Sequence, residues 1–177
     1  MRGGEELSQA VLISIRPKWC EKIISGEKTI EVRKMRPKMD MPFKCYIYRS
    51  VQGGVIGEFI CDDIFERIVR VGARFEPPKY CICDWNMDCT PLDTLLADAC
   101  LTKDELEKYL DGGVGYGWHI SGLKIYNTPR KLSEFKGLCK VESDCCACPY
   151  YNYSKMDCDG RTIKHPPQSW CYVEEFP

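Results

Sequence analysis

Three charged residues at fixed spacing are the most chemically suggestive feature of this sequence. Residues 26–33 read GEKTIEVR, in which a glycine precedes Lys28, Glu31 and Arg33. The glycine is expected to end a helix in a left-handed conformation, and the alternation over 29–34 predicts a strand. Glu31 and Arg33 then share one face of that strand, beside a lysine in the turn. Such a charged cleft could hold a phosphate, with the carboxylate orienting a base or sugar. A salt-bridged surface cluster that adds little stability explains the pattern equally well.

A second set of candidate ligands lies in a cysteine-rich segment. Cys145 and Cys148 have the spacing with which a zinc knuckle begins, and Cys139 and Cys158 could supply two further thiolates. Four sulfur ligands would fill a tetrahedral zinc site, so its role would be structural. Cys146 could replace one ligand or take no part. The alternative is a flexible loop with reduced thiols.

The chain has 13 cysteines, which is a high and an odd number. The first residues lack the apolar region of a secretory signal, so we expect a cytoplasmic protein with reduced thiols. Its remaining cysteines are then buried single thiols that pack like small hydrophobic residues. The group Cys81, Cys83 and Cys89, even with Cys100, has poorer spacing for a metal.

Charge is distributed unevenly along the chain. The net charge is −1, but residues 1–50 carry 11 Lys and Arg against 6 Asp and Glu, a sum of +5, so the rest sums to −6. A basic N-terminal third can form a local positive face in a neutral protein. A solvated lysine-rich surface is the alternative.

Several functional classes are disfavoured by what the sequence lacks. No stretch approaches the ~20 apolar residues of a membrane span. Two histidines are too few for a His-rich metalloenzyme, and no P-loop, GxGxxG or GxSxG motif occurs. We therefore expect no membrane association and no organic cofactor.

Strand patterns dominate the predicted secondary structure. Alternating or β-branched runs predict strands at 10–15, 29–34, 43–49, 55–61, 64–71, 118–126 and 170–174, and amphipathic patterns predict helices at 17–25, 91–100 and 103–111. Strand, tight turn and strand over 43–61 indicate a meander, not a β-α-β unit. The expected fold is a single α+β domain over 1–177. It would be a mixed β-barrel of five to seven strands with two or three short helices, and with insertions at about 74–90 and 139–160.

The charged motif and four further blocks resemble one known family. GEKTIEVR matches the GxKxxExR signature of ASCH domains, which belong to the PUA-like superfamily. The blocks VIGEF, LTKDEL, YGWHIS and PPQSWCYVEE follow in the order found in small bacterial and prophage ASCH proteins. The match is distributed over 10–71, 91–135 and 165–175. The resemblance implies a PUA-like barrel whose cleft, flanked by the first helix, binds RNA or a nucleotide.

The resemblance also assigns site residues. Lys28, Glu31 and Arg33 would line the cleft, and the rim candidates are Arg16, Trp19, Trp118 and His119. An exposed aromatic ring at the rim would stack on a base. Trp118 could equally be a core residue.

An enzymatic role is the main alternative to binding. Some ASCH relatives are amidohydrolases that deacetylate acetylcytidine, with the motif lysine, a threonine and a separate glutamate. Here Lys28 is retained, but Glu31 stands in place of that threonine, and Thr29 points to the opposite face. For the separate glutamate, Glu105 and Asp98 are only candidates. The same hydrolysis is therefore not expected.

Two other roles stay open. Other ASCH-like proteins are proposed ribonucleases, and here Lys28 or Arg33 could stabilise charge while Glu31 or His119 acts as a base. A protein-interaction module is a further possibility. Binding of RNA or a nucleotide is the favoured interpretation.

Overall fold

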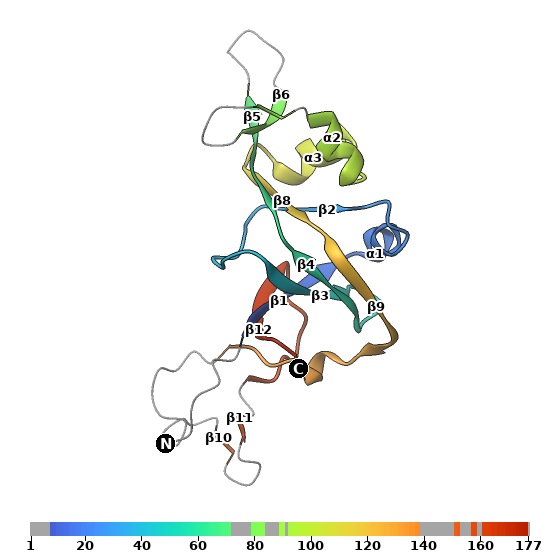
Figure 1. Ribbon diagram of the computed structural model, residues 1–177, viewed down its shortest axis with the longest axis vertical. Coiled ribbons are helices and arrows are strands. Elements are labelled where there is room, and N and C mark those ends of the chain that lie inside the picture. The colour runs from blue at the N-terminus through green and yellow to red at the C-terminus, as the bar shows by residue number, and fades with distance from the viewer. Residues whose placement is uncertain are drawn as a thin grey trace. The chain divides into compact units, whose positions relative to one another are not determined.

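The computed structural model describes residues 8–71, 79–83, 89–90, 92–138, 151–152, 157–158 and 161–176 (Figure 1). These residues fall into two compact units. The first draws on 1–17, 44–58 and 124–177, and the second on 18–43 and 59–123.

The first unit is built on a five-stranded sheet in the order β12-β1-β3-β4-β9. Its strands are β1 (Gln9–Ile15), β3 (Phe43–Arg49), β4 (Val55–Cys61), β9 (Ser121–Arg130) and β12 (Trp170–Glu174). Strand β1 is parallel to β3 and antiparallel to β12. The core of this unit is formed by Ala10, Leu12, Tyr46, Val55, Phe135 and Val173. It also contains a short 3-10 helix, Leu132–Glu134, and the two-stranded pair β10 (Tyr151–Asn152) and β11 (Asp157–Cys158).

The second unit is built on an antiparallel sheet in the order β2-β8-β5-β6-β7. Its strands are β2 (Ile30–Arg33), β5 (Ile64–Val71), β6 (Lys79–Cys83), β7 (Cys89–Thr90) and β8 (Gly115–His119), and its helices are α1 (Pro17–Ile24), α2 (Leu92–Asp98) and α3 (Lys103–Leu110). Ile30 and Val32 of β2 pack with residues of α2 and α3 such as Leu95 and Leu106. Because strand side chains alternate, Glu31 and Arg33 point to the other face.

The predicted elements are largely confirmed, but the closed barrel is wrong. Strands 43–49, 55–61, 64–71 and 170–174 have the bounds that the sequence predicts, and the three predicted helices are present. The described strands instead pair into two open five-stranded sheets, because β4 pairs in the first sheet and β5 in the second. The number of strands therefore exceeds the predicted five to seven.

Two local predictions are also corrected. The strand expected at 118–126 is two strands, β8 and β9, which are separated at Ile120. The expected irregular insertion at 74–90 contains β6 and β7. The prolines and cysteines of that region favoured an irregular loop, whereas β6 pairs with β5 from Ile68↔Ile82 to Val71↔Lys79.

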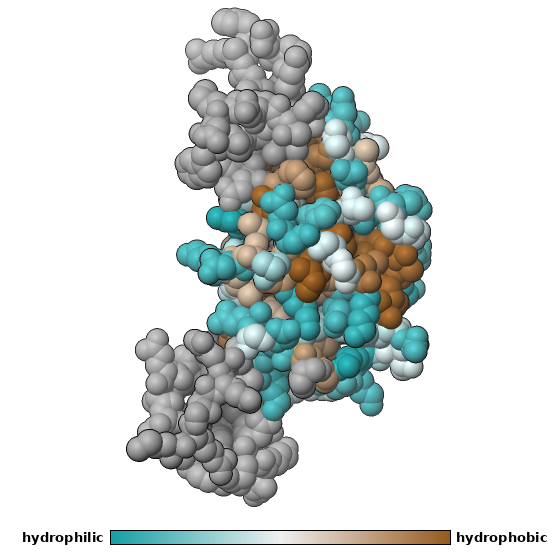
Figure 2. All heavy atoms as spheres, viewed as in Figure 1, coloured by the Kyte–Doolittle hydropathy of each residue, from teal (hydrophilic) through white to brown (hydrophobic). Residues whose placement is uncertain are grey.

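The surface is mixed in character. Figure 2 shows brown hydrophobic residues among teal hydrophilic ones on the face in view. Among large hydrophobic residues of the second unit, Ile24, Met35 and Met41 are exposed. None of the described helices has the length and apolar character needed to cross a membrane.

Candidate functional site

The turn after α1 places the first residue of the charged motif. Gly26 has φ +79°, in the left-handed region that glycine adopts without strain, and its N–H donates to Ile23 O at 3.1 Å. The N–H of Lys28 then donates to Lys22 O at 2.9 Å, and that of Thr29 donates to Asp98 O at 2.9 Å. The predicted glycine cap is thus confirmed. It ties the turn to both α1 and the end of α2.

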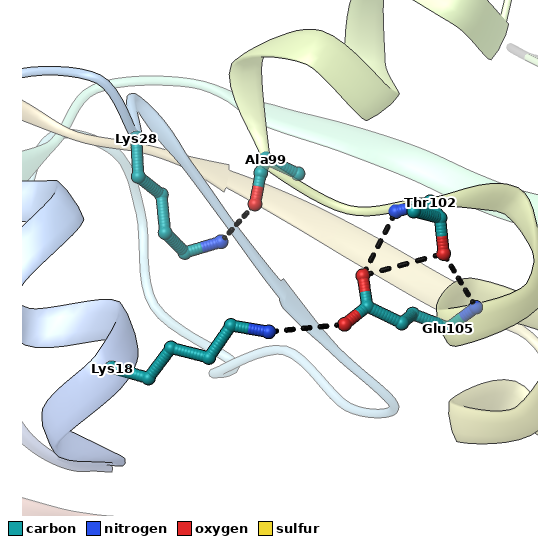
Figure 3. A network of polar contacts seen from close by, with 5 residues as sticks. All are labelled: Lys18, Lys28, Ala99, Thr102 and Glu105. Atoms are coloured by element: carbon teal, nitrogen blue, oxygen red, sulfur yellow. Dashed lines mark hydrogen bonds and ion pairs between the residues drawn. The ribbon is translucent and has the colours of Figure 1, made fainter.

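The Lys28 side chain is buried and has three acceptors. Its ammonium donates to Ile30 O and to Ala99 O, each at 2.7 Å, and lies 3.3 Å from Glu31 Oε2. Figure 3 shows the contact with Ala99, which follows α2. Lys28 is only 3% exposed. Because an ammonium has three N–H donors, these contacts use all of them, and Lys28 connects the turn, β2 and the end of α2.

Glu31 joins Lys28 to Arg33. Its second oxygen, Oε1, lies 2.9 Å from Arg33 Nη2. Glu31 is 6% and Arg33 8% exposed. We call Lys28, Glu31 and Arg33 the motif cluster. The sequence correctly placed Glu31 and Arg33 on one strand face, but the three residues form a buried cluster and not an open cleft. Two cations and one carboxylate leave it with a formal charge of +1.

Trp19 of α1 lies beside the motif cluster. The Lys28 ammonium is 5.2 Å from the centroid of the Trp19 ring, and the ammonium of Lys18 is 4.2 Å from it. Lys18 also reaches across to Glu105 of α3, with 3.1 Å between Nζ and Oε1 (Figure 3). Trp19 is partly exposed, so it could contact a ligand while it packs on the cluster.

Glu105 has a second role at the start of α3. Its carboxylate accepts from the Thr102 N–H at 3.0 Å, and the Thr102 hydroxyl accepts from the Glu105 N–H at 3.1 Å. This capping box was predicted from the sequence and is confirmed. The hydrogen bond from the Thr102 N–H lowers the pKa of Glu105 most, and the Lys18 ammonium lowers it further. Glu105 therefore holds the start of α3 and the end of the Lys18 side chain together.

Tyr109 is a site residue that the sequence analysis did not single out. It lies one helical turn beyond Glu105 on α3 and is 39% exposed. The Lys34 ammonium lies 5.5 Å from the centroid of its ring. Burial raises the pKa of Tyr109, and the Arg33 guanidinium opposes that rise. The four-residue spacing from Glu105 on a capped helix was the available signal.

Comparison with known proteins bears on the fold. No protein-family model matches the sequence, and no curated protein does. Among solved structures, the crystal structure of ASCH from Zymomonas mobilis is similar with a TM-score of 0.57, over 94% of this chain and 88% of that chain, at 18% identity. The chain has the ASCH fold. Two point variants of the Zymomonas mobilis protein are also similar. One has a TM-score of 0.56 over 94% and 89% of the two chains at 18% identity, and the other 0.50 over 70% and 76% at 19%. The resemblance predicted from the motif blocks is confirmed at the level of the fold.

The two site candidates on β8, Trp118 and His119, have different surroundings. Trp118 lies opposite Glu31 in the β2–β8 pair, is fully buried and packs edge-on against Phe43, with ring centroids 6.1 Å apart. It has no exposed face for a base. His119 points to the other face of the sheet, and its Nδ1 lies 2.7 Å from Asp62 Oδ1. The structure therefore does not bring His119 to the motif cluster.

Three further residues were predicted for the site: Arg16, Asp98 and Glu105. Arg16 is exposed and belongs to the first unit. Asp98 provides a backbone carbonyl at the motif turn, and no side-chain role follows from that contact. Glu105 lies near the motif cluster, although its carboxylate is used by the helix cap and by Lys18.

The predicted zinc ligands lie almost wholly outside the described residues. This applies to Cys139, Cys145 and Cys148, and the side chain of Cys158 is not described either. Within the described part of the chain, no three His, Cys, Asp or Glu side chains form a group that could hold a metal. Zinc binding by this ASCH fold stays a prediction. Elsewhere, Cys61 is a buried thiol, and burial raises its pKa to about 12.

Proposed function

We propose that this chain is an RNA- or nucleotide-binding ASCH domain that binds its ligand on the second unit, beside the motif cluster. The observation that carries the proposal is the buried Lys28–Glu31–Arg33 cluster with its formal charge of +1 and its flanking surface cations. Charges that are shielded from solvent are screened less by salt than exposed ones. The two cations of the cluster therefore add to the attraction that the exposed cations beside it exert on a phosphate.

The exposed cations next to the cluster would make the direct contacts. Residues 34–38 read KMRPK and follow β2 immediately, and Lys34, Arg36 and Lys38 are all exposed. Lys18 lies on α1, next to Trp19, and its side chain is 61% exposed. Long side chains at such positions can reach phosphates, as nucleic-acid binding requires. The ASCH fold, which in the resemblance is an RNA-binding fold, is consistent with this role.

The geometry supports binding more strongly than hydrolysis through the motif lysine. A lysine that acts as a nucleophile or base needs a free lone pair and access to substrate. The Lys28 ammonium instead donates to two backbone carbonyls and faces a carboxylate, at 3% exposure. We therefore assign the motif cluster a positioning and electrostatic role.

The test is a titration with a fluorescently labelled RNA at about 50 mM and about 200 mM salt. About three phosphate contacts on a single strand predict a roughly 20-fold loss of affinity between these conditions. The variant that carries Lys34→Gln, Arg36→Gln and Lys38→Gln should bind weakly and lose most of the salt dependence.

A matched variant controls for total charge. Lys124→Gln, Lys131→Gln and Lys164→Gln remove three exposed cations from the first unit. This control should bind like the unaltered protein. Absence of RNA binding in the unaltered protein would refute the proposal, and so would an equal loss in the control.

A further inference from the structure

Two partly exposed aromatic rings of the second unit are each covered by an exposed lysine. The Lys18 ammonium lies 4.2 Å from the ring centroid of Trp19, and the Lys34 ammonium lies 5.5 Å from that of Tyr109. Trp19 and Tyr109 belong to different helices, α1 and α3. The same arrangement thus occurs twice around one site.

The motif cluster lies between these two rings in the chain of contacts. At one end, the Lys28 ammonium is 5.2 Å from the Trp19 ring. At the other end, Arg33 is followed directly by Lys34, whose ammonium covers the Tyr109 ring. Contacts within the cluster of 3.3 and 2.9 Å connect the two ends. Trp19 therefore adjoins the cluster itself, and Tyr109 adjoins the residue that follows it.

A lysine over an exposed ring is a contact that a nucleobase can replace. A cation over an exposed ring is worth roughly a 2-fold to 5-fold factor in an equilibrium. A base stacked on an aromatic side chain is worth roughly 5-fold to 150-fold. The released ammonium can then pair with the phosphate that accompanies the base. Stacking is thus favoured over the resting contact, and the lysine is not left without a partner.

We infer that Trp19 and Tyr109 are stacking platforms for unpaired bases, and that the ligand class of this site is single-stranded RNA. The inference rests on the proposed function and makes it more specific. Lys18 and Lys34 cover the rings in the free protein and contact phosphates in the complex. A duplex does not fit, because its bases are paired and stacked on each other and present no free face to a side chain.

The first experiment compares one labelled oligoribonucleotide of mixed sequence alone and annealed to its complement. The single strand should bind, and the duplex should bind at least 10-fold more weakly, roughly the loss of one stacked base. Tyr109→Ala should weaken single-strand binding by roughly 5-fold to 150-fold, whereas Tyr109→Phe should stay close to the unaltered protein because it keeps the ring. Trp19→Leu and Trp19→Phe form the corresponding pair.

The second experiment uses surface variants that should not disturb folding. Lys34→Met removes one phosphate contact, so the slope of log affinity against log salt should fall by roughly 0.7. Lys103→Met is the matched control. Lys103 is exposed and pairs with Glu107 at 3.9 Å. Around the axis of α3 it lies about 160° from Glu105 and about 120° from Tyr109. Its slope should equal that of the unaltered protein.

The outcomes separate this inference from the proposed function. If the unaltered protein binds no RNA, both fail. If it binds RNA but the duplex binds as tightly as the single strand, or if Tyr109→Ala and Trp19→Leu both bind normally, only the stacking inference fails. Circular dichroism and thermal unfolding establish that each variant is folded. A folded Tyr109→Ala variant with lost binding, and a Tyr109→Phe variant with retained binding, would confirm it.

Discussion

Lys18 and Lys28 contact the same tryptophan ring from two different environments. The side chain of Lys18 is 61% exposed and forms one ion pair, with Glu105. That of Lys28 is 2% exposed and is held by two carbonyls and a carboxylate. In the buried region around Lys28, each charge would be costly to leave without a partner. The surface around Lys18 and Lys34 can exchange its contacts at little cost. The motif residues therefore support the site, and under the proposal the exposed residues outside the motif contact the ligand.

The largest expected effect comes from removing the ammonium of the buried Lys28. Lys28→Met leaves the carbonyls of Ile30 and Ala99, and one oxygen of Glu31, without their donor. We expect a loss of about 3–5 kcal/mol in the free energy of unfolding, measured by urea denaturation with an unchanged m-value.

Lys22→Met is the matched control for Lys28→Met. Lys22 lies on the same helix-turn segment and forms a surface pair with Glu27 at 2.9 Å. Its replacement should hardly change the urea midpoint. Equal midpoints for the two variants would contradict a supporting role for Lys28.

A smaller effect is expected on the apolar face of β2. A Cβ added at Gly117 of β8 would lie 3.0 Å from Ile30 Cγ2 and 3.2 Å from Leu95 Cδ1. Gly117→Ala should therefore destabilise the protein by about 1–3 kcal/mol through overpacking, as measured by thermal unfolding.

Gly137→Ala provides the comparison for that variant. The nearest atom to its added Cβ is Arg161 O at 3.6 Å, an ordinary contact. The melting temperature of this variant should be close to that of the unaltered protein. If the melting temperature of Gly117→Ala also equals that of the unaltered protein, β2 is not held tightly against α2 and α3.

The smallest effect is expected at the exposed Lys18–Glu105 pair. Glu105→Gln keeps a side-chain acceptor for the Thr102 N–H but loses the attraction to Lys18, so we expect a loss of about 0.2–1 kcal/mol near neutral pH. Since the pKa of Glu105 is lowered in the folded protein, its stabilising contribution is present above the usual glutamate value of 4.5. That contribution is lost as the pH falls below it.

The pH dependence gives this prediction its control. The difference between the Glu105→Gln variant and the unaltered protein should shrink as thermal unfolding is followed below pH 4.5. A difference that stays constant through this range would mean that the charge of Glu105 contributes nothing to stability.

Local patterns predicted most of the secondary structure but not the architecture. The strands at 43–49 and 55–61 follow from side-chain alternation and a glycine-rich turn, both of which act between neighbouring residues. The pairing of β5 with β8, and not with β4, depends on contacts between distant segments. No local period encodes that choice, so the predicted single barrel was wrong.

The site was predictable to the same extent. Spacing alone placed Glu31 and Arg33 on one face, because strand side chains alternate. The burial of the motif cluster depends on Ala99, which is distant in the sequence from Lys28. Tyr109 joins the site only because α3 packs beside the end of β2, where Lys34 covers its ring.

The amino-acid sequence by itself determined the helix cap at Gly26, the capping box of α3, the shared face of Glu31 and Arg33 and the resemblance to ASCH proteins. These features depend on residues a few positions apart, or on their order along the chain. Only the tertiary structure decided that Lys28 is saturated by its neighbours, that Trp118 is buried, and that Trp19 lies beside Lys28 and Tyr109 beside Lys34. Solvent exposure and hydrogen-bond saturation are set by whichever distant segments pack against a side chain, and those contacts exist only in the folded protein.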